Sequence, residues 1–191
     1  RMIRRGVQMT NDEITARAEK IRVACQRLTR LMESTLNAAR LDEGEVTLNL
    51  RVCSLPELLD TVVDSQPEED QQRIEVVIDA LPRLIMADTV LLEQAVQNLV
   101  SNAIKYTLSG KVIVGVRRRG KEAVIQVVDS GIGIPSSKFR TIFKEFARLD
   151  EGAKTAAGLG LGLSIVDRLS RILHHPVHLS SVQGRGTSFR V

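Results

Sequence analysis

Three polar residues that can bind a charged ligand follow one line along a predicted helix. Asn98, Asn102 and Lys105 step by four and three residues, so a helix places them on a single stripe. The carbonyl oxygen of Asn102 suits Mg²⁺, which takes one or two protein oxygens beside phosphate oxygens and water. Lys105, one turn further on, could meet a phosphate. Taken alone, the stripe is better explained as an ordinary polar helix surface.

A second candidate lies where a predicted apolar strand ends, in the segment VVDSGIGIP of residues 127–135. Asp129 closes the strand, so we expect its carboxylate in a half-buried pocket where it can accept a hydrogen bond from an exocyclic amine. Gly131 and Gly133 would let a flat base approach the backbone closely. Taken alone, the segment is more simply read as an Asp-Ser-Gly turn.

A third candidate is the segment GLGLGLSIV of residues 158–166, where alternating glycines lead into a predicted helix. Converging backbone N–H groups and the helix N-terminus favour an anion there. A flexible loop before an amphipathic helix is the plainer alternative. Leu163 and Ser164 follow the last glycine, so the Walker A pattern is absent. The polar stretch 151–157 upstream does not resemble the strand that a dinucleotide-binding unit needs.

The helix that carries the asparagines has a clear buried face. Asp88 precedes its first turn and predicts the N-cap. Its apolar residues also step by four and three residues, which is the rhythm of a face that packs on a core: Leu92, Val96, Leu99, Ala103 and Tyr106. We therefore expect the polar stripe to lie beside the core.

The remaining pattern after Gly44 predicts strands joined by hairpins, with helices between them. Strands are expected over 46–52, 73–79, 84–87, 111–118, 123–129, 177–181 and 187–191, and helices over 56–65 and 161–173. Strands paired by hairpins, with helices collected on one side, predict an α+β sandwich rather than a doubly wound sheet.

The first part of the chain has a different character. Residues 11–41 contain no Pro or Gly and carry an apolar seam for about four heptads, which predicts a long bundle helix. Thr10 and Glu13 form a capping box at its start. A helix this long needs partner helices, so we expect a fragment cut inside a helical hairpin. The predicted domains are therefore 1–44, a partial dimerisation hairpin, and 45–191.

Composition excludes several classes of function. Hydrophobic residues make up 43% and charged residues 26% of the chain, and no apolar run is long enough to cross a bilayer. The net charge is only +4 and aromatic residues are 3%, so we expect no nucleic-acid binding. The basic run Arg117–Arg119 is read as a solvated hairpin tip. Cys25 and Cys53 are too few for a disulfide framework or a zinc site.

The motifs in their order resemble the ATP-binding domain of sensor histidine kinases. They are Asn-x-x-x-Asn-Ala-x-Lys-Tyr at 98–106, Asp-x-Gly-x-Gly at 129–133, Phe-x-x-Phe at 143–146 and Gly-x-Gly-x-Gly-Leu at 158–163. This domain belongs to the superfamily that includes DNA gyrase. The resemblance covers about 46–191 and implies its fold, a two-layer sandwich of a mixed, largely antiparallel sheet and helices. The preceding helix resembles the second helix of the family's dimerisation and phosphoacceptor domain.

The resemblance implies a role for each matching position. Asn102 matches the Mg²⁺ ligand, with Asn98 beside it on the triphosphate side, and Lys105 and Arg148 match phosphate contacts. The positions matching nucleotide contacts are Tyr106, Asp129, Gly131, Gly133 and Thr187 around the adenine, and Gly158, Gly160, Leu161, Gly162 and Leu163 on the phosphate side. Phe143 and Phe146 match a motif that packs a mobile lid over 151–157.

The implied activity is transfer of the ATP γ-phosphoryl group to a histidine, then to an aspartate of a response-regulator receiver domain. At the position of Asn98 the superfamily's hydrolases carry a glutamate that activates water, and an amide cannot act as that base. The resemblance further implies ATP and Mg²⁺ as ligands and a homodimeric parent. It implies a cytoplasmic location without membrane contact by this fragment, although the parent could be anchored in the inner membrane.

The chain departs from the family in its histidines. His174, His175 and His178 all follow the glycine loop, on the wrong domain for the phosphoacceptor. We therefore expect this chain to bind ATP–Mg²⁺ without phosphorylating itself. His175-Pro176 replaces a frequent Gly-Gly pair, which alters that turn but not the nucleotide site. Two alternatives stay open: an ATPase acting as a conformational clamp, and a pseudokinase that only docks partners.

Overall fold

The computed structural model describes residues 17–18, 47–78, 84–120, 122–147 and 160–191. The chain divides into two units, Arg1–Val46 and Thr47–Val191. Of the first unit only Arg17 and Ala18 are described, and both are helical. The predicted bundle helix over 11–41 and its capping box therefore lie outside the described residues, and the domain assignment stays a prediction.

The second unit is built on a five-stranded sheet in the order β2-β4-β5-β7-β6. The strands are β2 (Ile74–Ile78), β4 (Val112–Arg119), β5 (Glu122–Asp129), β6 (His178–Val182) and β7 (Gly186–Arg190). β2 runs parallel to β4, and the other neighbours are antiparallel. The sheet is thus mixed and largely antiparallel, and both expected hairpins, β4–β5 and β6–β7, are confirmed.

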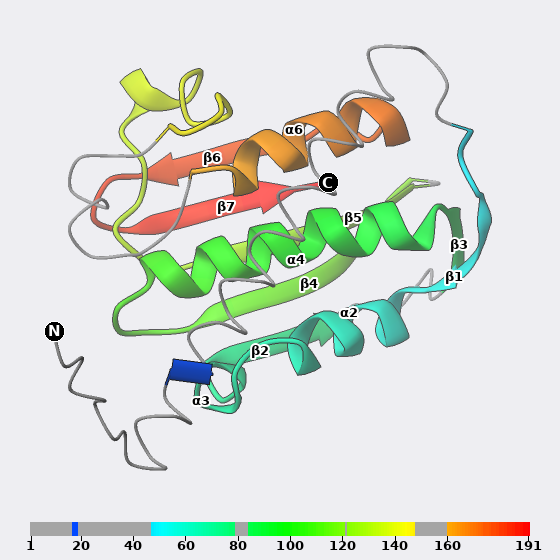
Figure 1. Ribbon diagram of the computed structural model, residues 1–191, viewed down its shortest axis with the longest axis horizontal. Helices are drawn as coiled ribbons and strands as arrows, with labels where there is room; N and C mark the ends of the chain where they lie inside the picture. The colour runs from blue at the N-terminus through cyan, green and yellow to red at the C-terminus, as the bar shows by residue number, and fades with distance from the viewer. Residues whose placement is uncertain (1–16, 19–46, 79–83, 121, 148–159) are drawn as a thin grey trace, which may run out of the picture. The chain divides into compact units, whose positions relative to one another are not determined.

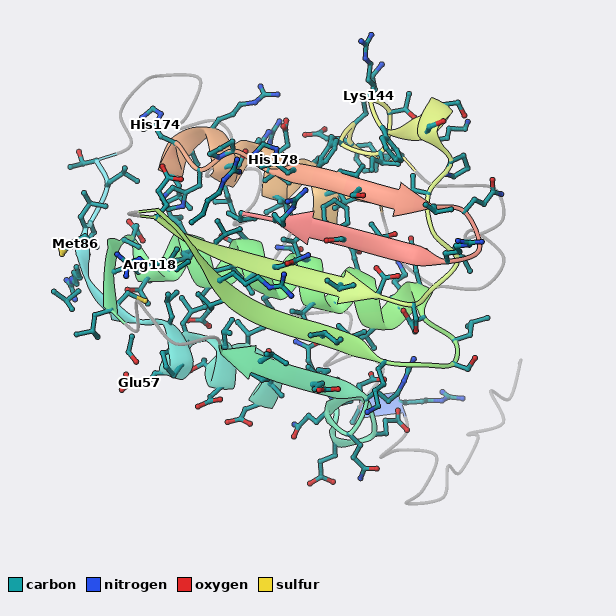
Figure 2. All side chains as sticks on the ribbon, turned by 180° about the vertical axis from the view of Figure 1, so that it is seen from behind. Glu57, Met86, Arg118, Lys144, His174 and His178 are labelled. Carbon is teal, nitrogen blue, oxygen red and sulfur yellow. The ribbon has the colours of Figure 1, made fainter. Side chains whose placement is uncertain are left out.

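Three helices lie in one layer on this sheet: α2 (Leu55–Asp64), α4 (Thr89–Tyr106) and α6 (Gly162–Leu173) (Figure 1). Seen from behind, the other face of the sheet carries no helix among the described residues (Figure 2). This confirms the predicted α+β sandwich. A short helix, α3 (Glu68–Gln71), and a 3-10 turn, η1 (Ser136–Lys138), are additions that the sequence pattern did not indicate.

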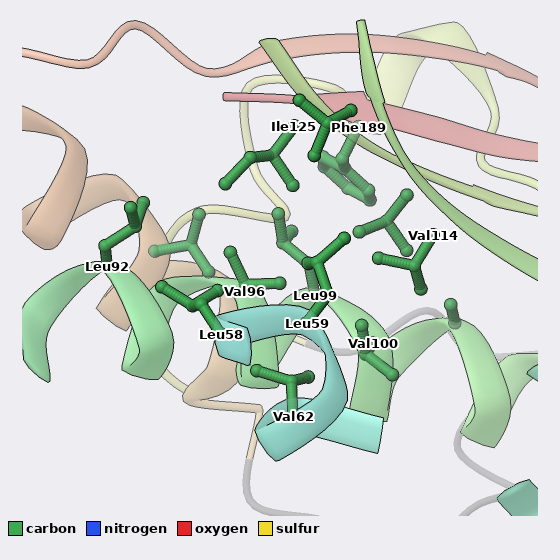
Figure 3. Packing of buried hydrophobic residues seen from close by; sticks show 14 of the residues in the cluster. Leu58, Leu59, Val62, Leu92, Val96, Leu99, Val100, Val114, Ile125 and Phe189 are labelled. Atoms are coloured by element: carbon green, nitrogen blue, oxygen red, sulfur yellow. The ribbon is translucent and has the colours of Figure 1, made fainter. Parts of the chain in front are cut away.

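The core forms between α4, α2 and the sheet. Four of the five residues of the predicted apolar stripe of α4 are buried, with Leu92, Val96 and Leu99 at no more than 1% exposure, whereas Tyr106 at its end is half-buried. Alternate residues of β4 face it, as a strand half-covered by helices requires. Figure 3 shows α2 and α4 side chains meeting those of the sheet. Because this stripe fixes the rotation of α4, the asparagine stripe beside it is fixed as well.

The first strand lies later in the chain than the pattern suggested. We predicted a strand over 46–52, but β1 covers Arg51–Ser54 and pairs antiparallel with β3 (Leu84–Ala87) in a separate two-stranded sheet. Because β3 has only four residues, it offers no partner to the residues before Arg51. The backbone N–H of Asn49 instead donates to Asp88 Oδ2 at 2.9 Å.

Asp88 begins α4 as predicted. Its Oδ1 accepts a hydrogen bond from the backbone N–H of Leu91 at 3.2 Å, which is the N-cap geometry. With Oδ2 bonded to Asn49, this buried carboxylate joins the start of α4 to the segment before β1.

The turn after α6 is capped by a histidine in the left-handed conformation. His174 has φ +53°, and the backbone N–H of His175 donates to the carbonyl of Ser170 at 2.9 Å. A residue with a Cβ costs about 1 kcal/mol more than glycine in this conformation. We therefore expect His174→Gly to raise the free energy of unfolding by about 1 kcal/mol, or roughly 2–4 °C in Tm.

Chemical and thermal denaturation measure this effect. The matched control is His178→Gly on β6, where glycine removes a side chain from a strand and should lower stability. A lower midpoint for His174→Gly would contradict the strain assigned to this cap.

Candidate functional site

A cavity of about 70 Å³ lies between the C-terminal half of α4, the loop after β5, the start of α6, and β7. The cavity is small and partly open, so it can hold a flat part of a ligand while the rest of that ligand lies outside it. Its lining residues are Asn102, Ala103, Tyr106, Asp129, Ile132, Gly133, Ile134, Ile142, Ala147, Leu163, Thr187 and Phe189. Six of these belong to the predicted site: Asn102, Tyr106, Asp129, Gly133, Leu163 and Thr187.

Asp129 is the buried charge of this cavity. It ends β5 with 9% of its surface exposed. Its Oδ1 accepts hydrogen bonds from the backbone N–H of Gly131 at 2.9 Å and of Thr187 at 3.2 Å. Burial raises the pKa of the Asp129 carboxyl, and these two hydrogen bonds oppose the rise. Within the described part of the chain Oδ2 has no hydrogen-bond donor, so it can accept one from a ligand.

The loop after β5 approaches neighbouring backbone so closely that only glycine fits. A side chain at Gly131 would collide with the carbonyl oxygen of Tyr106. Gly133 has φ +66°, and a side chain there would collide with the carbonyl of Val182. The backbone N–H of Ile132 donates to that Tyr106 carbonyl at 3.2 Å. Gly131 therefore holds the cavity wall against the end of α4, and Gly133 holds it against the end of β6.

A serine that sequence reasoning missed supports the same wall. Ser181 Oγ accepts from the backbone N–H of Ile134 at 2.8 Å and lies 3.0 Å from Thr187 Oγ1. It also donates to the carbonyl of Gly186 at 2.8 Å. No motif contains Ser181, but its place on β6 opposite Thr187 follows from the hairpin register. Ser181 thus ties the loop after β5 to the β6–β7 hairpin.

The asparagine stripe meets the start of α6. A Cβ added to Gly162 would lie 2.9 Å from Asn102 Nδ2 and 3.4 Å from Asn98 Oδ1, so glycine allows the helix to begin directly on both amides. The N-cap residue, Leu161, has no side chain that can cap this end of α6, and no other residue in the described ranges caps it. The N–H groups of its first turn therefore lack intrahelical partners and can bind an anion. Asn98 also donates from Nδ2 to the carbonyl of Gln94 at 2.8 Å.

Lys105 and Asn98 do not line the cavity itself. The ammonium of Lys105 lies 5.0 Å from the centre of the Tyr106 ring, within the range of a cation–π contact. Tyr106 does line the cavity, so Lys105 lies beside a lining residue. Asn98 lies against the start of α6 instead.

The two phenylalanines of the Phe-x-x-Phe motif differ. Phe143 packs edge-to-face on Phe189, with ring centres 6.5 Å apart, and so supports the cavity from behind. Phe146 is 67% exposed and has φ +60°. Arg148, Gly158 and the predicted lid over 151–157 lie outside the described residues. Gly160, with φ +73°, lies against the backbone of Ala147 and Phe146.

The donor set fits a metal ion only when a ligand brings further oxygens. Among the described residues no three His, Cys, Asp or Glu side chains lie close enough to hold a metal. Asn98 and Asn102 each have an amide oxygen beside the start of α6, and of the two only Asn102 lines the cavity, where its oxygen suits Mg²⁺ carried by phosphates. None of the helices in the described ranges has the length and apolarity needed to cross a membrane.

Comparison with known proteins gives consistent results. Residues 87–191 match the family described as "Histidine kinase-, DNA gyrase B-, and HSP90-like ATPase". The circadian input-output histidine kinase CikA of Synechococcus elongatus is 31% identical over 173 residues, which cover 87% of this chain and 23% of that protein. The sensor-like histidine kinase SenX3 of Mycobacterium tuberculosis is 33% identical over 184 residues, covering 90% of this chain and 43% of SenX3.

Among solved structures, full-length ShkA in complex with AMPPNP matches with a TM-score of 0.76 and 27% identity, over 96% of this chain and 39% of ShkA. The chain thus spans less than half the length of these relatives. The match with the family begins at Ala87, just before the N-cap of α4, and includes every element that lines the cavity.

Proposed function

Since this chain belongs to the family of histidine kinase-, DNA gyrase B- and HSP90-like ATPases and is homologous to sensor histidine kinases, we propose that its cavity binds ATP with Mg²⁺. The observation that carries the proposal is the position of the Asp129 carboxylate. It lies in a mostly apolar cavity whose lining also includes Asn102 and, in the first turn of α6, Leu163.

The adenine occupies the buried end of the cavity. Asp129 Oδ2 accepts a hydrogen bond from the exocyclic amine, while Oδ1 stays on its two backbone donors. Apolar side chains such as Ile132 and Ile142 contact the faces of the base, and Tyr106 lies at its edge. Thr187 Oγ1 supplies a further polar atom beside Asp129. This arrangement selects a base with an amino group at that position and disfavours guanine, which presents a carbonyl there.

The triphosphate leaves the cavity along the asparagine stripe. The first-turn N–H groups of α6 donate to phosphate oxygens, and Lys105, beside Tyr106, contributes its positive charge. Asn102 places its amide oxygen where Mg²⁺ would be held. When bound, Mg²⁺ neutralises the charge that develops on the phosphate oxygens during transfer. We assign Arg148 and Gly158 to the phosphates from the family resemblance.

The reaction we propose is phosphoryl transfer rather than hydrolysis. Asn98 has no basic atom with which to activate water, and its amide nitrogen is already bonded to the Gln94 carbonyl. In the transfer step the terminal phosphorus–oxygen bond of ATP breaks, a phosphorus–nitrogen bond to an imidazole forms, and ADP leaves. From the histidine the phosphoryl group passes to an aspartate of a response-regulator receiver domain. The parent kinase that carries the histidine is a homodimer.

None of the three histidines in this chain is the acceptor of the phosphoryl group. His174, His175 and His178 line a different cavity, which reaches α4 at Leu92. The nucleotide cavity reaches α4 at Asn102, roughly 15 Å further along the helix. We therefore expect the chain to bind ATP without labelling itself.

Two measurements test this function on the chain as it stands. Isothermal titration calorimetry should show binding of AMPPNP with Mg²⁺ and at least tenfold weaker binding of the guanine analogue. Incubation with γ-labelled ATP should leave no label on the protein. Absence of AMPPNP binding would favour the partner-docking alternative. Hydrolysis lost on Asn98→Ala would favour the ATPase alternative, and label on this chain would overturn the assignment of the acceptor.

A further inference from the structure

A second and larger cavity, of about 540 Å³, lies at the other end of α4 from the nucleotide cavity. It is bounded by β3, by the β4–β5 hairpin, by the turn after α6, and by the ends of β6 and β7. Its size is within the range of small-molecule sites. Figure 2 shows Met86, Arg118 and His174 at this end of the molecule. The proposed kinase function makes no use of it.

The lining of this cavity is rich in basic residues. Its described lining includes Arg119, Arg190 and, from the segment 174–178, all three histidines of the chain. Glu122 is the single acid among these described lining residues. The strand register explains the grouping, because Arg190 on β7 lies opposite His178 on β6. Arg119 and Glu122 face each other across the β4–β5 hairpin.

The two arginines keep their charge available. Both Arg119 and Arg190 are exposed, and neither forms an ion pair with any residue in the described ranges. Arg171, by contrast, pairs with Asp167 at 2.6 Å. An unpaired guanidinium presents a planar set of donors that matches a carboxylate or a phosphate. These two arginines therefore attract an organic anion to the cavity.

The cavity also has apolar lining residues that the core leaves exposed. Leu84 and Met86 on β3 are 60% and 61% exposed, and the buried Leu92 lines the cavity as well. Val191 and Pro176 continue the apolar lining. Large aliphatic side chains exposed beside a cavity mark a contact surface for another apolar group.

From this combination of basic and apolar lining residues we propose that the cavity binds an amphiphilic organic anion, with its acidic head on Arg119 and Arg190 and its apolar tail against Leu84 and Met86. The bound molecule exchanges contact with water for contact with both kinds of lining residue at once. Neither a simple inorganic anion nor an uncharged alkyl chain would use the whole site.

The histidines add a pH dependence to this site. Burial lowers the pKa of His175, and the neighbouring His174 lowers it further. A bound anion opposes both effects, so binding should take up protons and strengthen as the pH falls through the range where imidazoles titrate. The other titratable or charged side chains that line the site are those of His178, Arg119, Arg190 and Glu122, and Glu122 alone would counteract the trend.

The three histidines also supply a site-specific probe. Because all of them line this cavity, the imidazole C–H signals in an NMR spectrum of the whole chain report on it alone. Sodium decanoate, below its micelle concentration, is the test ligand. We expect it to shift these signals saturably, with affinity rising about fourfold per methylene from hexanoate to decanoate. AMPPNP should leave the same signals in place.

Matched variants and ligands decide the result. Arg119→Gln with Arg190→Gln should weaken decanoate binding at least tenfold, while Arg140→Gln, an exposed arginine outside the lining, should not change it. Decyltrimethylammonium should bind at least tenfold more weakly than decanoate. The proposal is overturned if histidine signals do not move, if the cationic amphiphile binds as well, if acetate equals decanoate, or if Arg140→Gln has the same effect.

Discussion

Asp129→Asn is expected to weaken AMPPNP–Mg²⁺ binding by about 10- to 100-fold, because a hydrogen bond to a charged acceptor is worth roughly 1.5–3 kcal/mol. The asparagine oxygen can keep both backbone hydrogen bonds, from Gly131 and Thr187. Its amide nitrogen then faces the exocyclic amine of adenine, so two donors oppose each other. Isothermal titration calorimetry at pH 7.5 measures the change.

The same substitution should leave the protein at least as stable at neutral pH. Burial raises the pKa of Asp129 above its usual value, so the folded state favours the protonated carboxyl. A group of this kind favours folding below its unfolded-state pKa, and that contribution is lost as the pH rises through the folded-state value. At pH 7 the buried charge therefore costs stability, and asparagine removes that cost. The Tm of Asp129→Asn should equal or exceed that of the parent.

A pH dependence of nucleotide binding follows with a definite sign. The adenine amine favours the ionised carboxylate, so affinity is full above the raised pKa of Asp129 and falls as the pH drops through it. Asp129→Asn should lack this component. Titration of the nucleotide itself is common to both proteins and cancels in the comparison. The control is Asp60→Asn on the exposed side of α2. Equal losses of AMPPNP affinity in the two variants would contradict the role of Asp129.

The parts of the fold that sequence predicted are those set by local rules. A helix period fixed the buried face of α4, and Asp88 marked its start because an N-cap needs only a few adjacent residues. The hairpins were predictable because antiparallel neighbours with short turns pair with each other. The parallel pairing of β2 with β4 had no such signal, since α4 and β3 separate them along the chain. The β1 strand was misplaced because its length depends on β3.

The candidate site shows the same division. Asp129 and the glycines stood out because their motifs are short and contiguous. That Gly162 touches Asn102 was not predictable from either motif, because it depends on how α6 packs against α4. Ser181 carried no motif at all and is found only through its bonds to Ile134 and Thr187. Sequence thus identified the chemical groups, whereas tertiary packing decides which of them meet.

The contact between the two helices leads to the second large prediction. Gly162→Ala should lower the Mg²⁺-dependent affinity for AMPPNP about tenfold, because its Cβ would lie 2.9 Å from Asn102 Nδ2 and the amide must move. Gly162 does not have a positive φ, so alanine fits the backbone and is the better helix former. Stability should therefore change little. Binding measured in EDTA should fall much less than binding with Mg²⁺.

A double-mutant cycle distinguishes displacement of Asn102 from a general change in α6. If Gly162→Ala acts through the Asn102 amide, then adding it to Asn102→Ala should cost little more than Asn102→Ala alone. Ser101→Ala, on the exposed side of α4 next to Asn102, should leave affinity unchanged. Additive losses in the cycle would mean that the methyl group disturbs the α6 terminus itself. Phosphate binding would then depend more on the backbone of α6 than on Asn102, the residue that the sequence alone predicts beside the phosphates.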